Sequence, residues 1–506
     1  MSEAKGEGGS TAAGVVEHAR PGTRSERLLS TYVREPARGR RLLGYELALV
    51  GRIINLGLPV VVGMMTQTAI NQIDALMVGR LPEQEAVAGT AALTPALILF
   101  WVFGGFLASI QVGTQAVVAR RFGGGDTNGA GKTLFNSVWV ALLSSLVVTI
   151  PALLVVEPYF QLITHDPAVR EAGVAYGSVR LIGIFSMVAM QSYKAFYDGV
   201  GRVLVFMSIA FLMNLINALL NWLLIFGALG FPKLGVEGAA WSSVISSSAG
   251  LVLMVAWTLR HAERDRFRVY RWQNFDLRVA GSVAKLSFFS GLATLFMMTG
   301  FYLFFVIVGK IDDAQGLPGI NVNATSIIIN LCMLVFMTCI AFGTSTATLV
   351  SQALGAGNPS LAARYGWHSV KLMVPVMVVV GTVMFLAPET LLRLYLPADA
   401  ADAMGLKEQV LQVASPALRV CGGLAPLAAA ALVLTQALYG AGESRFVMKI
   451  ELFLHRFCLV PLSWFLAVRL ELGLLGCWYA ACVYGVSLLV AVGAKFSSGT
   501  WQRTEI

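Results

Sequence analysis

The chain has 506 residues, of which 57% are hydrophobic and only 13% are charged, and its mean hydropathy is +0.72. Soluble proteins carry about 25% charged residues, so this composition excludes a large water-soluble protein. The net charge of +9 does not point to a nucleic-acid partner, because the basic residues gather in a few segments that fit contact with anionic membrane lipids.

The first segment, residues 1–44, is rich in Gly, Ala, Ser, Glu and Arg. It lacks the apolar stretch of about 7–15 residues that a secretory signal peptide needs, so we expect a disordered cytoplasmic tail. About twelve apolar stretches follow, each near the roughly 20 residues with which a helix crosses a membrane. We place these spans at 46–79, 88–119, 134–156, 174–197, 203–228, 237–259, 286–309, 323–350, 369–393, 412–438, 446–468 and 473–494.

The basic residues predict the orientation of the spans. Most Lys and Arg lie in the tail, in the connection 260–285 and in the loops on the same side. Because cytoplasmic loops are enriched in Lys and Arg, we expect both termini in the cytoplasm and a multi-pass protein in the inner (plasma) membrane. The six cysteines lie in apolar segments without a CxxC pair, so we predict neither disulfides nor a zinc site.

The chain also contains an internal repeat. The sequence GTQAVVARRFGGGD at 113–126 reappears as STATLVSQALGAGN at 345–358, which pairs Thr114 with Thr346. Two later pairs of segments repeat in the same order at nearly the same spacing. We therefore predict an all-α membrane protein of two pseudo-symmetric, parallel six-helix bundles, an arrangement typical of transporters. The predicted parts are the N-terminal lobe 45–259, a basic linker 260–285, the C-terminal lobe 286–496 and a cytoplasmic tail 497–506.

Ionisable groups inside a span cost at least about 2.5–3.5 kcal/mol, so they mark candidate sites. Asp74 lies in the first span, with Gln67 two turns earlier on the same helical face and Pro59 in mid-span as a candidate hinge. An alternative is that Asp74 sits at the outer membrane boundary and pairs with Arg80. The repeat places Phe304 opposite Asp74, so we expect a cation site in the N-terminal lobe alone.

The fifth span offers partners for Asp74. Asn214, Asn217 and Asn221 are three and four residues apart and share one helical face. Their amides could complete a site for Na⁺ or for a protonatable carboxyl; the alternative is that they only bridge helices.

Further ionisable residues lie in other spans. The basic ones either reach an interface or line a cavity, and they are Arg180, Lys194, Arg419 and Arg456. Glu451 and His455 are four residues apart, which predicts a local ion pair.

Several motifs together resemble the multidrug and toxic compound extrusion (MATE) transporters. They are NQIDALMVGRL in the first span, FYDGVG at 196–201, N-x-x-x-N-W-L-L-I-F-G at 217–227, PKLGVEGAAW at 232–241, GAGN at 355–358 and F-x-x-G-x-W at 496–501. The resemblance implies a V-shaped central cavity and export of amphipathic, cationic drugs or metabolites against inward H⁺ or Na⁺. It implies no enzymatic activity and no cofactor besides the coupling ion, and we expect a monomer.

The resemblance also implies site residues. The matching positions are Pro59, Gln67, Asp74, Asn217 and Asn221, with Ser243 near a sixth-helix threonine of the family. One branch carries two more acidic residues, where this chain has Met297 and Ala428, so we expect coupling through the N-terminal lobe alone. The main alternative function is a lipid or glycolipid flippase whose basic cavity residues hold an anionic headgroup. A membrane enzyme is disfavoured, because no Ser/His/Asp set or metal-spaced histidines occur in the spans.

Overall fold

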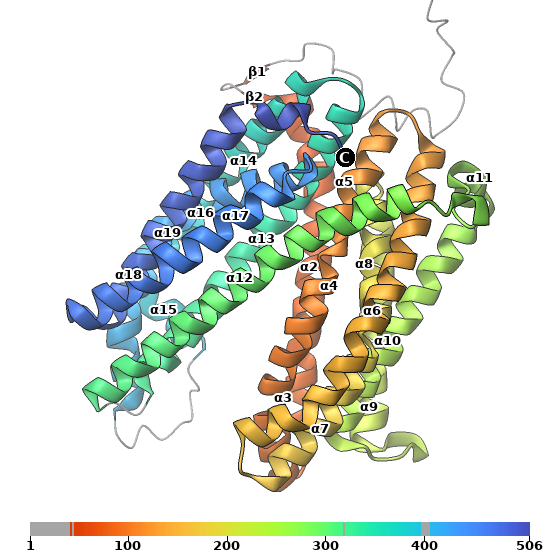
Figure 1. Ribbon diagram of the computed structural model, residues 1–506. Coiled ribbons are helices and arrows are strands. Elements are labelled where there is room, and N and C mark those ends of the chain that lie inside the picture. The colour runs from red at the N-terminus through yellow and green to blue at the C-terminus, as the bar shows by residue number, and fades with distance from the viewer. Residues whose placement is uncertain (1–40, 43–44, 317–318, 396–404) are drawn as a thin grey trace, which may run out of the picture.

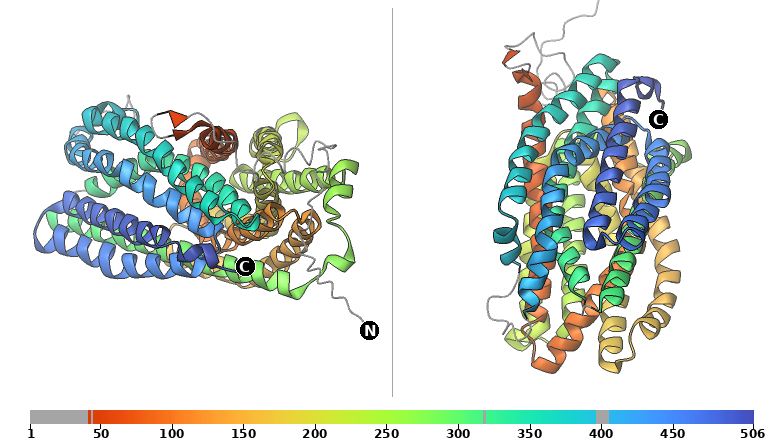
Figure 2. Two further views of the ribbon diagram at one scale, coloured as in Figure 1. Left: turned by 90° about the horizontal axis from the view of Figure 1, so that it is seen from above. Right: turned by 90° about the vertical axis from the view of Figure 1, so that its left-hand side faces the viewer.

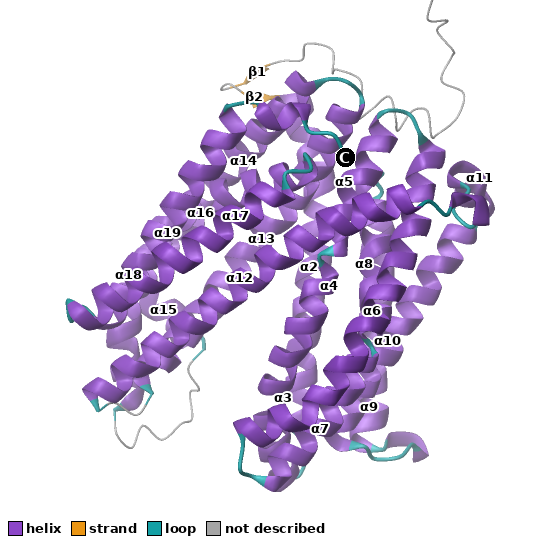
Figure 3. Ribbon diagram, in the orientation of Figure 1, coloured by secondary structure: helices purple, strands orange, loops and turns teal. Residues whose placement is uncertain are grey.

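The computed structural model describes residues 41–42, 45–316, 319–395 and 405–506. Of the predicted tail 1–44, only Arg41–Leu42 falls inside this part: it forms strand β1 and pairs antiparallel with β2 (Tyr45–Glu46). Nearly all of the remaining chain is helical (Figure 3).

The helices of the two halves follow the predicted spans closely. The first half contains α2 (Leu47–Val78), α3 (Glu83–Phe100), α4 (Phe106–Ala108), α5 (Ile110–Gly123), α6 (Thr127–Ile163), α7 (Pro167–Ile182), α8 (Ile184–Gly199), α9 (Val203–Phe226), α10 (Gly235–Leu259) and α11 (His261–Phe267). The second half contains α12 (Leu277–Gln315), α13 (Ile320–Gly355), α14 (Pro359–Leu386), α15 (Pro388–Arg393), α16 (Leu406–Gly440), α17 (Ser444–Leu454), α18 (Val460–Trp464) and α19 (Gly473–Ser497).

Within the described residues, eleven helical segments are long and apolar enough to cross a membrane. The bent pair α7 and α8, which meet at 42° around Gly183, makes the twelfth. Helical turns of the π type join α3 to α4 at Trp101–Gly105, and follow α17 at His455–Leu459 and α18 at Phe465–Arg469. The predicted count of about twelve spans is confirmed.

The helices form two bundles. In Figure 1 the bundles meet at the end that carries the C-terminus, and their other ends diverge; Figure 2 shows the same arrangement from two further sides. Hydrogen bonds between the bundles join the middle of α5 to the C-terminal part of α13. Gln115 donates from Nε2 to the Thr344 carbonyl at 2.8 Å, and Ser351 donates to the Ala116 carbonyl at 2.8 Å.

The pseudo-symmetry predicted from the repeat is visible at single hydrogen bonds. The hydroxyls of Thr114 and Ser137 lie 2.5 Å apart, and those of the equivalent Thr346 and Ser369 lie 2.7 Å apart. The helix caps repeat in the same way. Asp126 accepts from the Gly129 amide at the start of α6, and Asn358 accepts from the Leu361 amide at the start of α14.

The first helix of each half contacts both bundles. Leu49, Ile53 and Leu56 of α2 are buried in a core formed mostly by C-terminal residues, whereas Val78 at the other end of α2 lies in an N-terminal core. The start of α12 likewise packs on the first bundle. Its cap residue Asp276 pairs with Lys132 at 2.7 Å. The helix therefore begins inside the segment 260–285 that the sequence predicted as a linker.

The predicted tail 497–506 is also packed against the bundles. Thr500–Arg503 forms a 3₁₀ turn in which Trp501 is fully buried. The Thr504 carbonyl accepts from the guanidinium of Arg120, which belongs to the first bundle. The tail thus connects the two halves where they meet.

Candidate functional site

Asp74 lies on α2 between α9 and α10, and only 5% of its surface is exposed. Asn221 of α9 donates from Nδ2 to Asp74 Oδ1 at 2.5 Å, and Ser243 of α10 donates its hydroxyl to Asp74 Oδ2 at 3.2 Å. Both carboxylate oxygens therefore have a donor. This position differs from the alternative of a boundary residue paired with Arg80, which is itself exposed.

Asn217 is the fourth member of this hydrogen-bonded group. Its Oδ1 accepts from Asn221 Nδ2 at 3.2 Å, and its Nδ2 lies 3.4 Å from the Ser243 hydroxyl. Asn217 and Asn221 are buried, as the helical spacing requires if that face of α9 points to α2 and α10. The structure thus brings together four of the predicted residues, from three helices.

One hydrogen-bond acceptor of this group has no partner among the described residues. The Oδ1 atom of Asn221 is buried and has no hydrogen-bond partner among the described residues, and neither has Oδ1 of Asn214, two helical turns earlier. An unpaired buried acceptor costs about 1–3 kcal/mol, so it marks a place where a donor or a cation would be stabilised. The two donors to Asp74 stabilise its ionised form, and a proton on this carboxyl would need the Ser243 hydroxyl to turn and accept it. A sodium ion would instead need rotation of the Asn221 amide, which would turn Oδ1 towards the carboxylate.

Arg180 of α7 is the charged group that acts on the Asp74 carboxylate. Its guanidinium lies over the ring of Phe100, 4.5 Å from the centroid, and its Nε is buried without a partner among the described residues. Arg180 was predicted as a cavity charge or a residue that reaches the interface. The structure instead places it as a cation near Asp74, which the sequence could not show because the two residues lie on different helices.

Two other predicted site residues, Gln67 and Pro59, also lie on α2. Gln67 lies in α2, but its side chain is outside the described part of the structure. Pro59 lies inside α2, which continues through it as one helix. Pro59 borders a small cavity next to Lys194 and Asp198 rather than next to Asp74.

Lys194 forms a buried ion pair. Its Nζ lies 2.8 Å from Asp198 Oδ2, with the side chains 5% and 2% exposed. Both residues lie on α8, one turn apart. Asp198 was not predicted as the partner of Lys194, although the spacing of four residues was a signal for it.

The remaining basic candidates lie apart from the Asp74 group. Arg419 on α16 and Arg456 after α17 are both exposed. Met297 on α12 and Ala428 on α16 are partly buried, and neither can bind a cation through a charge. No cluster of three or more His, Cys, Asp or Glu residues suited to a metal occurs in the described ranges.

A cavity of about 880 Å³ lies away from Asp74, between α2, α9 and α11. Its lining is mostly apolar and includes Asn55, Trp257 and the charged residues Arg202, Glu263 and Arg266. Arg202 and Glu263 form an ion pair with each other. This cavity therefore does not contain the group of polar residues that the sequence predicted as the coupling site.

Comparisons with known proteins agree with the duplicated fold. The MatE family model matches residues 59–223 and 287–465, more than half of the chain. The probable multidrug resistance protein NorM of Rhizobium meliloti is 26% identical over 429 residues, covering 84% of this chain and 88% of that protein. The multidrug resistance protein NorM of Burkholderia vietnamiensis is also 26% identical, over 454 residues, covering 86% and 91%.

Among solved structures, an outward-facing multidrug resistance MATE family transporter of the MOP superfamily superposes with a TM-score of 0.80. It is 20% identical in sequence, and the match covers 94% of this chain and 99% of that one. This likeness shows the fold. Together with the family match over both halves, it shows that the chain belongs to the MatE family of multi-pass membrane transporters, which are not enzymes.

Proposed function

We propose that this protein is a secondary active exporter of amphipathic, cationic drugs or metabolites, driven by inward movement of H⁺ or Na⁺ across the inner membrane. The observation that carries the proposal is the buried Asp74 carboxyl, held by Asn221 and Ser243 beside an unpartnered amide oxygen. The similarity to NorM multidrug resistance proteins supports it.

Asp74 would couple export to the ion gradient through its charge. Burial disfavours a charged carboxylate, whereas the two donors and Arg180 favour it, so the balance can change when the helices move. A proton or Na⁺ bound in one arrangement of the lobes and released in the other would drive the cycle. The amide nearest to Asp74 presents its nitrogen, which is not a ligand for Na⁺, whereas a proton needs only the Ser243 hydroxyl to turn, so we expect H⁺ to be the coupling ion.

The substrate class follows from the same group. A carboxylate among apolar helices attracts a cation, while apolar and aromatic surface supplies most of the affinity for an amphipathic compound. Expression in a drug-sensitive host should raise tolerance to cationic dyes and quaternary ammonium compounds. The flippase alternative needs basic residues free to hold an anionic headgroup, and Lys194 is already paired with Asp198. Unchanged drug tolerance together with altered lipid asymmetry would favour the flippase.

Reconstituted efflux tests the proposal. Purified protein in liposomes loaded with a fluorescent cationic dye should export the dye when an inward pH or Na⁺ gradient is imposed, and the two gradients are to be imposed separately. We expect the pH gradient alone to drive efflux. Efflux that neither gradient accelerates would refute secondary active export.

A further inference from the structure

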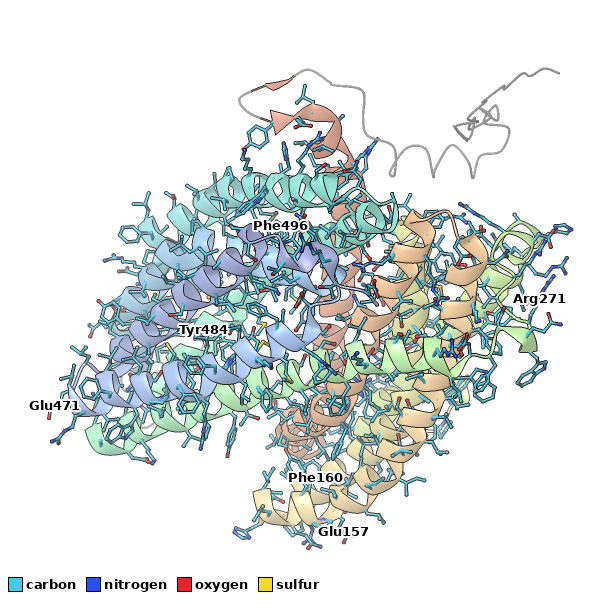
Figure 4. All side chains as sticks on the ribbon, turned by 45° about the horizontal axis from the view of Figure 1, so that its top comes forward. Glu157, Phe160, Arg271, Glu471, Tyr484 and Phe496 are labelled. Carbon is cyan, nitrogen blue, oxygen red and sulfur yellow. The ribbon has the colours of Figure 1, made fainter. Side chains whose placement is uncertain are left out.

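The C-terminal lobe contains a buried ionisable group that the proposed coupling site does not use. Glu451 of α17 and His455, one turn later, are 8% and 3% exposed, and His455 Nδ1 lies 3.2 Å from a carboxylate oxygen of Glu451. Tyr484 of α19 donates its hydroxyl to Glu451 Oε2 at 2.8 Å. Figure 4 labels Tyr484 among the helices of this lobe.

The hydrogen bonds assign the protons of the imidazole. Nδ1 faces two acceptors, the Glu451 backbone carbonyl at 2.9 Å and the Glu451 carboxylate, so Nδ1 carries a hydrogen. Nε2 is buried and has no partner among the described residues. It is therefore the ring atom at which a proton can be gained or lost without breaking a hydrogen bond.

Charge balance shows why a proton belongs there. With a neutral imidazole, an ionised Glu451 would be an uncompensated negative charge in a membrane-spanning bundle. One added proton makes the pair neutral overall. The two donors to Glu451, from Tyr484 and His455, stabilise the carboxylate form, which places the added proton on the imidazole at Nε2.

In the described part of the chain, the groups found around the pair offer no other compensating charge. Tyr439 of α16 and Tyr484 of α19 face Glu451, and Cys458 lies near Tyr484. From α12 the ring of His455 meets Gly300 and Phe301, which do not titrate. The charged residues of the same helical segment are on its exposed side: Arg445, Lys449 and Arg456.

We propose that Glu451 and His455 form a second proton-binding site, in the C-terminal lobe, that binds one exchangeable proton at His455 Nε2. Gly300 connects this site to α12. A Cβ atom at Gly300 would lie 2.1 Å from His455 Cδ2, so the imidazole rests directly on the helix that contacts both lobes. The use of this proton in transport rests on the proposed export function, whereas its binding does not.

The binding test is nitrogen NMR of the histidines in the purified full-length protein, in lipid nanodiscs. His368 is the matched control: it is also buried, but its Nδ1 faces the Arg364 carbonyl and its Nε2 accepts from the Glu46 amide. We expect the nitrogen signals of His455, assigned by their loss in His455→Gln, to report a proton gained and lost at Nε2 as the pH is varied. His368, whose two ring nitrogens both have hydrogen-bond partners, is the reference signal in the same spectra.

The variant Glu451→Gln keeps the size and hydrogen-bonding capacity of the side chain but removes its charge. It should displace or abolish the change in His455 protonation, because the carboxylate that compensates the imidazolium charge is gone. A His455 that keeps one protonation state throughout, or a transition that is the same in the wild type and in Glu451→Gln, would overturn the proposal. These results do not depend on whether the protein exports drugs.

A second experiment, on transport, measures the number of protons moved per exported dye molecule in proteoliposomes. Glu451→Gln should export dye with one proton fewer per cycle than the wild type. An unchanged ratio would overturn the role of this site in transport. Absence of wild-type efflux under any gradient would refute the export function, with the NMR result still standing on its own.

Discussion

Gly123 and Gly355 lie at one crossing of α5 and α13, each against the backbone of the other's helix. A Cβ atom at Gly123 would lie 2.1 Å from the Gln352 carbonyl oxygen, and one at Gly355 would lie 1.9 Å from the Arg120 carbonyl oxygen. Gly123 is the repeat equivalent of Gly355, and Arg120 that of Gln352. The crossing therefore has the pseudo-symmetry of the whole chain, and it holds the two lobes together at the end that carries the C-terminus.

This packing predicts that a single methyl group weakens the contact between the lobes. Gly123→Ala or Gly355→Ala should destabilise this arrangement by about 1–3 kcal/mol, because backbone atoms cannot move aside easily. The control is Gly281→Ala in α12, where a Cβ atom meets nothing within 4 Å. Thermal unfolding in detergent measures the effect. Equal melting temperatures for Gly123→Ala and Gly281→Ala would contradict this account of the crossing.

The buried pair Lys194–Asp198 gives a second prediction. Lys194→Met leaves Asp198 as an unpaired charge that is 2% exposed, which should cost about 3–5 kcal/mol. The matched control is the surface pair Lys233–Glu85, with side chains 45% and 49% exposed, where Lys233→Met should change the stability by less than about 1 kcal/mol. If thermal unfolding gives both variants the same small effect, Lys194 is not held by Asp198.

Asp276, at the start of α12, gives a prediction for pH. The hydrogen bond from the Lys132 ammonium and the amide of Arg278 hold the pKa of the Asp276 carboxyl below its usual range. Because the folded value is lower than the unfolded value of about 3.9, these bonds stabilise the fold above that pH, and the stabilisation is lost as the pH falls through the folded pKa. Carbon NMR should show the Asp276 midpoint rising towards about 3.9 in Lys132→Met. An unchanged midpoint would mean that Lys132 does not bind Asp276 in solution.

The membrane topology is tested by accessibility. Tags at both termini and in 260–285 should be reachable only from the cytoplasmic side, since these segments carry most of the basic residues. A tag in the connection 316–319 between α12 and α13, within the loop 310–322 expected from the sequence, should be reachable from outside intact cells. Labelling of 260–285 from outside would contradict the predicted orientation.

The fold was largely predictable because a single sequence carries two strong signals of it. Long apolar stretches mark the spans, and the repeated glycine motif around Gly123 and Gly355 marks the duplication. The break at Gly183 between α7 and α8 was not predictable, because the bent helices together read as one apolar stretch. The packing of α2 against both hydrophobic cores was also not predictable, because it depends on how the bundles pack.

The candidate site was predictable in part. The carboxylate in an apolar span singled out Asp74, and the spacing on α9 placed Asn217 and Asn221 on one face. The closeness of Arg180 to Asp74 and of Tyr484 to Glu451 depends on helices far apart in the chain. No local pattern records such pairs, so they required the structure.

The coupling role of Asp74 is the central claim, and the efflux rate of Asp74→Asn tests it most directly. The substitution keeps the shape and most hydrogen bonds but removes the charge. Asn217→Ala and Asn221→Ala should weaken coupling less, because neither residue carries the charge, and Met297→Leu should have little effect. With equal amounts of folded protein in liposomes, Asp74→Asn should lose gradient-driven dye efflux while it can still bind the dye. Efflux by Asp74→Asn at the wild-type rate would show that Asp74 does not couple transport to the ion gradient.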